Sequence, residues 1–214
     1  MGAKTCMLVY ADGNVADVLK TYPPLDREAS TALVSRLFPS DKFEPLEDGS
    51  LLFTSPPRDE IRVGCFPGVS IIAADEVAAN PAELAPNFLG EGAGKTIYMH
   101  FMHSVVEAMA FAVWKNGQLT RSLYLSLEGE VVEEFGPRLP FEEPYWAGER
   151  PADEEDGEYP FPFDVMEMGE SALLEFFGYQ VEGTRFEESQ LFDPEKIPLL
   201  RFKRVKEKPW WKVW

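Results

Sequence analysis

The chain has 214 residues, of which 45% are hydrophobic and 13% aromatic. A chain of this length and composition buries a sizeable core, which excludes a largely disordered protein. Its formal net charge is −17. Proteins that bind DNA or RNA generally gain affinity from positive charge, so this balance excludes general nucleic-acid binding.

The N-terminus and the cysteines bear on the compartment. The opening MGAKTCMLVYADG has a short apolar run without a small-residue cleavage site, so it lacks a secretory signal pattern. Cys6 and Cys65 stand in apolar runs and are predicted to be buried thiols. The longest apolar stretch, residues 97–114, is interrupted by polar residues and is shorter than the about 20 residues that a membrane-spanning helix needs. We expect a cytoplasmic protein without a transmembrane segment.

The first elements are a strand and two helices. Residues 5–10 (TCMLVY) are apolar at consecutive positions, which predicts a strand buried on both faces at the centre of a sheet. A short helix is expected at residues 15–20. Asp26 is a suitable N-cap for a second helix, which Pro39 ends.

Three further strands are predicted at residues 50–54, 61–66 and 69–73. The Pro67-Gly68 turn joins the last two into a hairpin. Asp75 is a candidate cap for a short helix, and Asn80-Pro81 indicates another helical turn.

The next region predicts an antiparallel meander with strands at residues 97–101, 108–114, 119–127 and 131–135. Its Asn116-Gly117 dipeptide suits a turn that requires positive φ. After a long Pro-rich loop, Asp164 and Glu167 form a capping pattern for a helix that ends at Gly178.

These elements predict an α+β fold, in which a largely antiparallel sheet is flanked by a few helices. We expect a single domain over residues 1–200, with a long acidic loop near residues 139–163. Residues 201–214 are predicted to form a basic, Trp-rich tail, because they carry six cationic residues and one glutamate.

Residues 90–96 (GEGAGKT) are similar to a phosphate-binding loop, in which backbone N–H groups and a lysine bind phosphates. That pattern requires a glycine where Leu89 stands, and it should join a strand to a helix. Here it leads into an apolar, strand-like run. We therefore expect a turn that binds no nucleotide, and we predict no cofactor.

His100 and His103 are the only histidines in the chain, so any imidazole-based catalysis must use one of them. On a helix they would share a face with Glu107 and could bind a metal. On a strand, which the neighbouring residues favour, they point to opposite sides. We predict structural histidines and no metal site. A hydrolase-type enzyme with a cryptic site near the two histidines is the alternative function.

The segment 139–163 (LPFEEPYWAGERPADEEDGEYPFPF) interleaves aromatics and prolines with a dense run of carboxylates. Loops of this length are usually functional or disordered. The partner-binding candidates in it are Glu142, Glu143, Tyr145 and Trp146. Two carboxylates beside a stacking aromatic also occur in glycosidases, but a charged loop anchored by its aromatics is the simpler interpretation.

The basic tail supplies the other partner-binding candidates, Trp210, Trp211 and Trp214. Indoles mixed with cations suit an acidic protein groove or an anionic membrane surface, so peripheral membrane contact is an alternative role for the tail. The simpler expectation is that the tail folds back on the body of the protein, where the acidic loop offers an intramolecular partner.

Several short motifs together resemble an uncharacterised family of actinobacterial proteins that open with MGAKT. The motifs are MGAKT at residues 1–5, VGCFPGV at 63–69, LPFE at 139–142, YWAGE at 145–149 and FFG at 176–178. The resemblance implies no catalytic residue, because the family has no assigned function.

The sequence as a whole predicts a non-catalytic protein that binds another protein through the acidic aromatic loop and the basic tail. Two features support this hypothesis: no catalytic motif is complete, and the two charge blocks have opposite signs. A third hypothesis is that the acidic face mimics a nucleic acid.

Overall fold

The computed structural model describes residues 2–77, 80–126, 130–152, 160–186 and 189–205. The strands are β1 (Lys4–Ala11), β2 (Phe43–Pro45), β3 (Gly49–Ser50), β4 (Glu60–Phe66), β5 (Val69–Ala73), β6 (Thr96–His103), β7 (Ala108–Lys115), β8 (Gln118–Ser126), β9 (Glu130–Phe135) and β10 (Pro198–Arg204). The helices are α1 (Val15–Leu19), α2 (Arg27–Leu37), α3 (Pro86–Glu91), α4 (Glu143–Trp146) and α5 (Val165–Phe177), with 3-10 turns η1 (Pro81–Glu83) and η3 (Pro194–Lys196).

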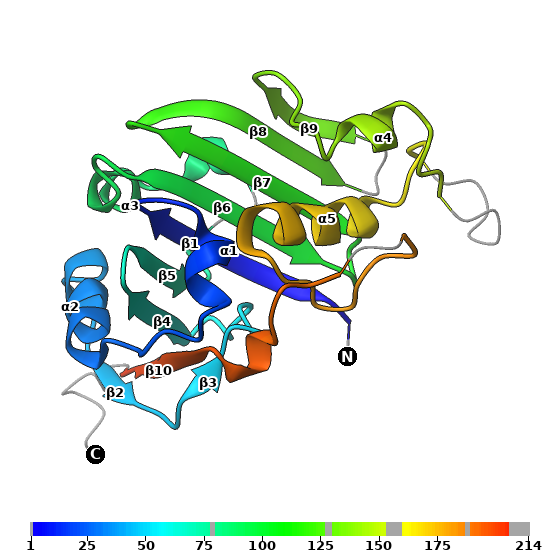
Figure 1. Ribbon diagram of the computed structural model, residues 1–214. Helices are drawn as coiled ribbons and strands as arrows, with labels where there is room; N and C mark the ends of the chain where they lie inside the picture. The colour runs from blue at the N-terminus through cyan, green and yellow to red at the C-terminus, as the bar shows by residue number, and fades with distance from the viewer. Residues whose placement is uncertain (1, 78–79, 127–129, 153–159, 187–188, 206–214) are drawn as a thin grey trace, which may run out of the picture.

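Within the described residues the strands form one sheet in the order β2-β10-β4-β5-β1-β6-β7-β8-β9, and β3 pairs with β10 (Figure 1). Neighbouring strands run antiparallel throughout. The predicted α+β class with a largely antiparallel sheet is therefore confirmed. No helix in these ranges is long and apolar enough to cross a membrane.

The central strand is β1, which pairs with β5 on one side and β6 on the other. Its residues are buried from Met7 to Ala11 without interruption. Because successive side chains alternate between faces, Met7 and Val9 enter one core and Leu8 and Tyr10 the other. The prediction of a strand buried on both faces is confirmed.

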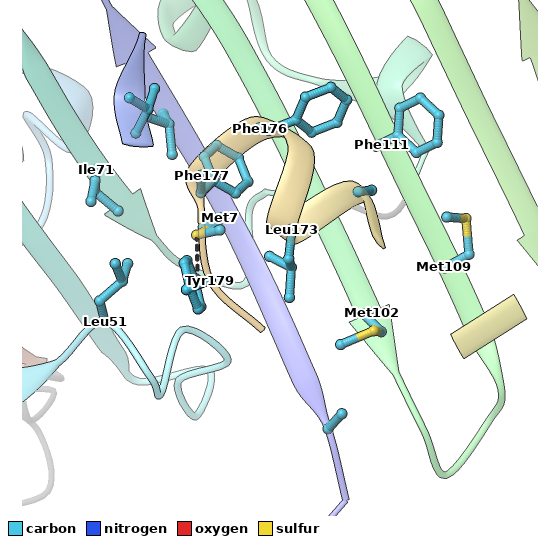
Figure 2. Close-up of a cluster of buried hydrophobic side chains, with 14 of the residues drawn as sticks. Met7, Leu51, Ile71, Met102, Met109, Phe111, Leu173, Phe176, Phe177 and Tyr179 are labelled. Atoms are coloured by element: carbon cyan, nitrogen blue, oxygen red, sulfur yellow. Dashed lines mark hydrogen bonds between the residues drawn. The ribbon is translucent and has the colours of Figure 1, made fainter. Parts of the chain in front are cut away.

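One core lies between the sheet and the helices α1 and α5. Figure 2 shows Met7, Met102 and Leu173 within this cluster. The Tyr179 hydroxyl donates to the Met7 sulfur, 3.8 Å away, which adds the segment after α5 to the same core. On the opposite face of the sheet, α2 and α3 contribute side chains to a second core.

The residues predicted to begin and end α5 do so in the structure. Asp164 Oδ1 accepts hydrogen bonds from the backbone N–H groups of Met166 at 2.7 Å and Glu167 at 3.2 Å. Gly178 ends the helix with φ of 82°, in the left-handed region that favours glycine. The hairpin turn between β7 and β8 also has positive φ at both Asn116 and Gly117, which confirms the predicted turn chemistry.

Other elements differ from the predictions. The predicted strand at residues 50–54 is limited to β3, because the chain turns after Ser50 and contacts the start of β1, where Thr54 accepts a hydrogen bond from the Cys6 N–H at 2.8 Å. Residues 75–77 form a turn, and the rest of the short helix predicted after Asp75 lies outside the described residues. Both α3 and α4 lack a side-chain cap and were not predicted. β10 lies between β2 and β4, so residues 201–204 of the predicted tail belong to the sheet.

We predict that Gly169→Val lowers the free energy of unfolding by about 1–3 kcal/mol, as overpacking of a core does. Gly169 lies in α5 against β6 and β7, and a Cβ there would be 2.8 Å from the sulfur of the buried Met102. The control is Gly90→Val in α3, where an added Cβ meets nothing within 4 Å. Urea denaturation measures the free energy of unfolding of both variants. Equal midpoints for the two variants would contradict the prediction.

Candidate functional site

His100 is a structural residue between the sheet and α5. It is fully buried, its Nδ1 is 2.7 Å from Thr5 Oγ1, and its Nε2 is 3.0 Å from the Gly169 carbonyl oxygen. Nε2 therefore donates to the carbonyl, and Nδ1 accepts from the Thr5 hydroxyl. Burial lowers the pKa of His100 to about 4, although the hydrogen bond to Gly169 acts in the opposite direction. The ring is neutral and holds β1, β6 and α5 together.

His103 does not join His100 in one site. β6 pairs in regular register with both neighbours, so His103 lies on the opposite face of the sheet from His100. Glu107 stands in the turn before β7 with φ of 43°. Within the described ranges, no group of three or more His, Cys, Asp or Glu side chains is arranged to hold a metal.

The glycine-rich turn at residues 90–96 joins α3 to β6, so a helix leads into a strand. This is the reverse of the order in a phosphate-binding loop. Both charged side chains of this turn lie near opposite charges: Glu91 forms an ion pair with Arg36, and Lys95 Nζ is 3.6 Å from Asp12. The prediction that this turn binds no nucleotide rests on that geometry.

The acidic aromatic segment is attached to the sheet by a buried ion pair. Arg121, in β8, is 1% exposed and Glu142 is 0% exposed. Arg121 Nε donates to Glu142 Oε1 at 2.9 Å, and Nη2 donates to Oε2. Glu142 Oε1 also accepts from the Leu139 N–H at 2.8 Å, and Arg121 Nη1 donates to the carbonyls of Phe135 and Gly136 at 3.1 and 3.2 Å. One guanidinium thus fixes the end of β9 and the start of α4.

Tyr145 is a second interior anchor of the segment. Its hydroxyl donates to the Glu167 carbonyl at 3.0 Å and is 2.8 Å from Ser171 Oγ, both in α5. Its ring packs edge-on against Phe163 and Phe186. The role of Glu142 and Tyr145 is therefore corrected from surface contact to anchoring, because both side chains are fully buried.

Glu143 and Trp146 are the accessible members of the predicted set. Glu143 is exposed, and Trp146 is half-buried against Phe163, with ring centroids 4.9 Å apart. The Arg138 guanidinium lies over the Trp146 ring, 4.1 Å from its centroid. The three tail candidates, Trp210, Trp211 and Trp214, lie outside the described residues.

β9 supplies surface residues that sequence reasoning missed. It lies at the end of the sheet beside α4, and β8 is its one partner among the described strands (Figure 1). Val131, Val132 and Phe135 are 44%, 46% and 52% exposed. A register shift between Tyr124 and Leu125 of β8 places two β9 residues opposite one, which is a β-bulge. The signal available in the sequence was the EVVEEF pattern of β9, in which all three polar residues are glutamates.

We define the β9–α4 surface as β9 together with Glu143, Trp146 and Glu149. It combines exposed apolar side chains with carboxylates along one edge of the sheet. Between Glu130 and Glu149 the sequence has six glutamates and one arginine, Arg138. Glu142 pairs with Arg121 in the interior, and Glu134 pairs with Arg121 and Arg138. Glu133, Glu143 and Glu149 leave the described part of the surface with a negative balance.

Comparison with known proteins identifies a family but no function. A family of unknown function (DUF6928) matches residues 5–202, so the chain belongs to that family. No curated protein and no solved structure matches the chain. The predicted membership of an uncharacterised family is thereby confirmed.

We predict that His100 makes the protein less stable in mild acid. The unfolded chain takes up a proton below the ordinary histidine pKa of about 6.5, whereas folded His100 stays neutral down to its pKa of about 4. Stability from this group is complete above about pH 6.5 and falls by up to about 3 kcal/mol as the pH approaches 4. The variant His100→Gln keeps a donor and an acceptor but does not titrate. Urea denaturation at several pH values should show the wild-type advantage shrinking with acid; parallel stability curves for the two proteins would refute this role.

We predict that Arg121→Met lowers the free energy of unfolding by about 3–5 kcal/mol, because it leaves the buried Glu142 without its cation. The double variant Arg121→Met with Glu142→Leu removes both charges and should be more stable than Arg121→Met alone. Arg138→Met is the surface control, with an expected loss of less than about 1 kcal/mol. If Arg121→Met and Arg138→Met unfold at the same urea concentration, the anchoring role is wrong.

Proposed function

We propose that this member of the DUF6928 family is a non-catalytic protein-binding module that receives an extended, basic segment of another protein along the β9–α4 surface. The observation that carries the proposal is the exposed apolar edge strand β9, bordered by carboxylates. The cytoplasmic location, the actinobacterial origin and the contact of the basic tail with a partner or membrane stay predictions.

The backbone of β9 favours an extended partner. A strand at the edge of a sheet presents N–H and C=O groups on its outer side, and another strand can pair with them. The six residues of β9 are enough for several such bonds. The bulge in β9 limits the pairing register, so it favours a specific partner segment over indiscriminate strand addition.

The side chains of the surface indicate the composition of that segment. Val131, Val132 and Phe135 offer apolar area, whose burial contributes roughly 25 cal/mol per Å². Glu134 of β9 is an exposed carboxylate, as are Glu143 and Glu149 of the segment that contains α4. A segment with lysine or arginine between apolar residues therefore complements the surface in both charge and hydrophobicity.

The buried anchors make the surface suitable for recognition. Arg121 and Tyr145 hold the start of α4 against the sheet and α5, so little chain entropy is lost when a partner binds there. A hydrolase-type enzyme with a cryptic site near the two histidines stays the alternative, and the positions of His100 and His103 on opposite faces of the sheet favour the binding role over it.

Selection of random peptides on the immobilised protein tests the proposal. We expect the selected peptides to alternate Lys or Arg with apolar residues, and their binding to weaken with salt because exposed charges are screened. Phe135→Lys should weaken binding at least tenfold, since it removes apolar area and adds a like charge to the partner. Val105→Lys is the matched control, because Val105 is 74% exposed in the turn after β6, away from this surface.

A peptide of residues 201–214 belongs in the same experiment. If it binds the β9–α4 surface in competition with the selected peptides, the partner is a second copy of this chain rather than another protein. Peptides that bind the wild type and Phe135→Lys equally well would refute the proposed surface.

A further inference from the structure

A cavity of about 590 Å³ lies on the α2 side of the sheet, between α2, the β4–β5 hairpin and the turn that follows α3. Its volume is within the range of small-molecule sites. β6, β7 and β8 separate its strands from β9, so the cavity is distinct from the β9–α4 surface.

The floor of the cavity is a row of polar side chains on neighbouring strands. Cys65 of β4 is the direct partner of Ser70 in β5, and Ser70 is the direct partner of Tyr10 in β1. All three side chains point to the α2 side of the sheet, and Cys65 and Ser70 line the cavity. Side chains in such register are about 5 Å apart at Cβ. A thiol, a hydroxyl and a phenol therefore stand side by side.

The Tyr10 hydroxyl has no hydrogen-bond partner among the described residues, although Tyr10 is only 1% exposed. The ring packs beneath the glycine-rich turn, where a Cβ on Gly92 would lie 2.8 Å from Tyr10 Cδ1. Burial and the nearby Glu91 carboxylate raise the pKa of Tyr10, so the phenol is protonated and is a donor. An unpaired buried hydroxyl is unfavourable, and a hydrogen-bond acceptor brought to it is stabilising.

The walls of the cavity carry two cations, Arg36 and Lys95, and two carboxylates, Asp26 and Glu91. Arg36 and Glu91 form a bidentate pair at 2.9 and 2.6 Å. Lys95 is more loosely held, since its Nζ is 3.6 Å from Asp12, beyond hydrogen-bond distance. The walls thus have both signs of charge and no net charge.

We propose that this cavity binds a small zwitterion of the amino-acid type. The ligand's carboxylate pairs with Lys95, its ammonium group lies toward Glu91 or Asp26, and Ser70 supplies a hydrogen bond from the floor. Leu25 and Phe66 line the same cavity and contact the apolar part of the ligand. A ligand with only one charged group would leave either the cations or the carboxylates of the cavity without an opposite charge.

Calorimetric titration of the full chain with each proteinogenic L-amino acid at millimolar concentration tests the proposal. Lactate, ethanolamine and glucose are the controls, because each lacks one or both charges. At least one amino acid should bind saturably, and the controls should bind at least tenfold more weakly. Lys95→Ala should weaken the binding at least tenfold, because it removes a hydrogen bond to a charged group. Lys196→Ala, which also removes a lysine from a loose exposed ion pair, should not change it.

Ser70→Ala gives a second test at the floor of the cavity. Because Ser70 lines the cavity, the variant should lose amino-acid affinity severalfold while its melting temperature stays close to that of the wild type. Wild-type affinity in this variant would overturn the proposal. So would the absence of any amino-acid binding, binding of ATP with magnesium in its place, or amino-acid binding that Lys95→Ala leaves unchanged.

Discussion

The structure depends on a sheet whose central strands are covered on both faces. β1 has no polar face, so α1 and α5 must cover one side of it, and α2 with α3 the other. Any polar side chain in the central strands then needs a partner inside the protein, because burial without one is costly. His100 meets this requirement with Thr5 and the Gly169 carbonyl. The Tyr10 hydroxyl has no such partner among the residues that the structure describes.

The same constraint decides which part of the sheet is left exposed. The helices cover the middle of the sheet, whereas β9 lies at its edge. The ion pair between Arg121 and Glu142 brings the acidic segment back to this edge, so a buried interaction creates an exposed surface. The α4 segment thereby lies beside β9 (Figure 1). The surface proposed to bind a protein and the cavity proposed to bind a small molecule lie at different parts of the sheet and are open to independent tests.

Local signals in the sequence were enough to predict most of the sheet and α5, because caps and turns depend on residues close together in the chain. Asp164 and Gly178 mark the two ends of α5 in this way. The interior position of Glu142 was not predictable, because its partner Arg121 stands in a strand 21 residues earlier and only packing brings them together. The four-residue α4 has no side-chain cap and lies in a Pro-rich segment. The polar row under the cavity depends on the register of three strands, which periodicity does not determine.

The proposed function requires β9 to accept an added strand from a basic segment. Hydrogen–deuterium exchange of the backbone amides, with and without a bound basic peptide, tests it most directly, because an added strand protects the amides of β9 that do not bond to β8. We expect new protection concentrated in β9 and at the start of α4. Protection that appears elsewhere in the chain while β9 exchanges as before would contradict it.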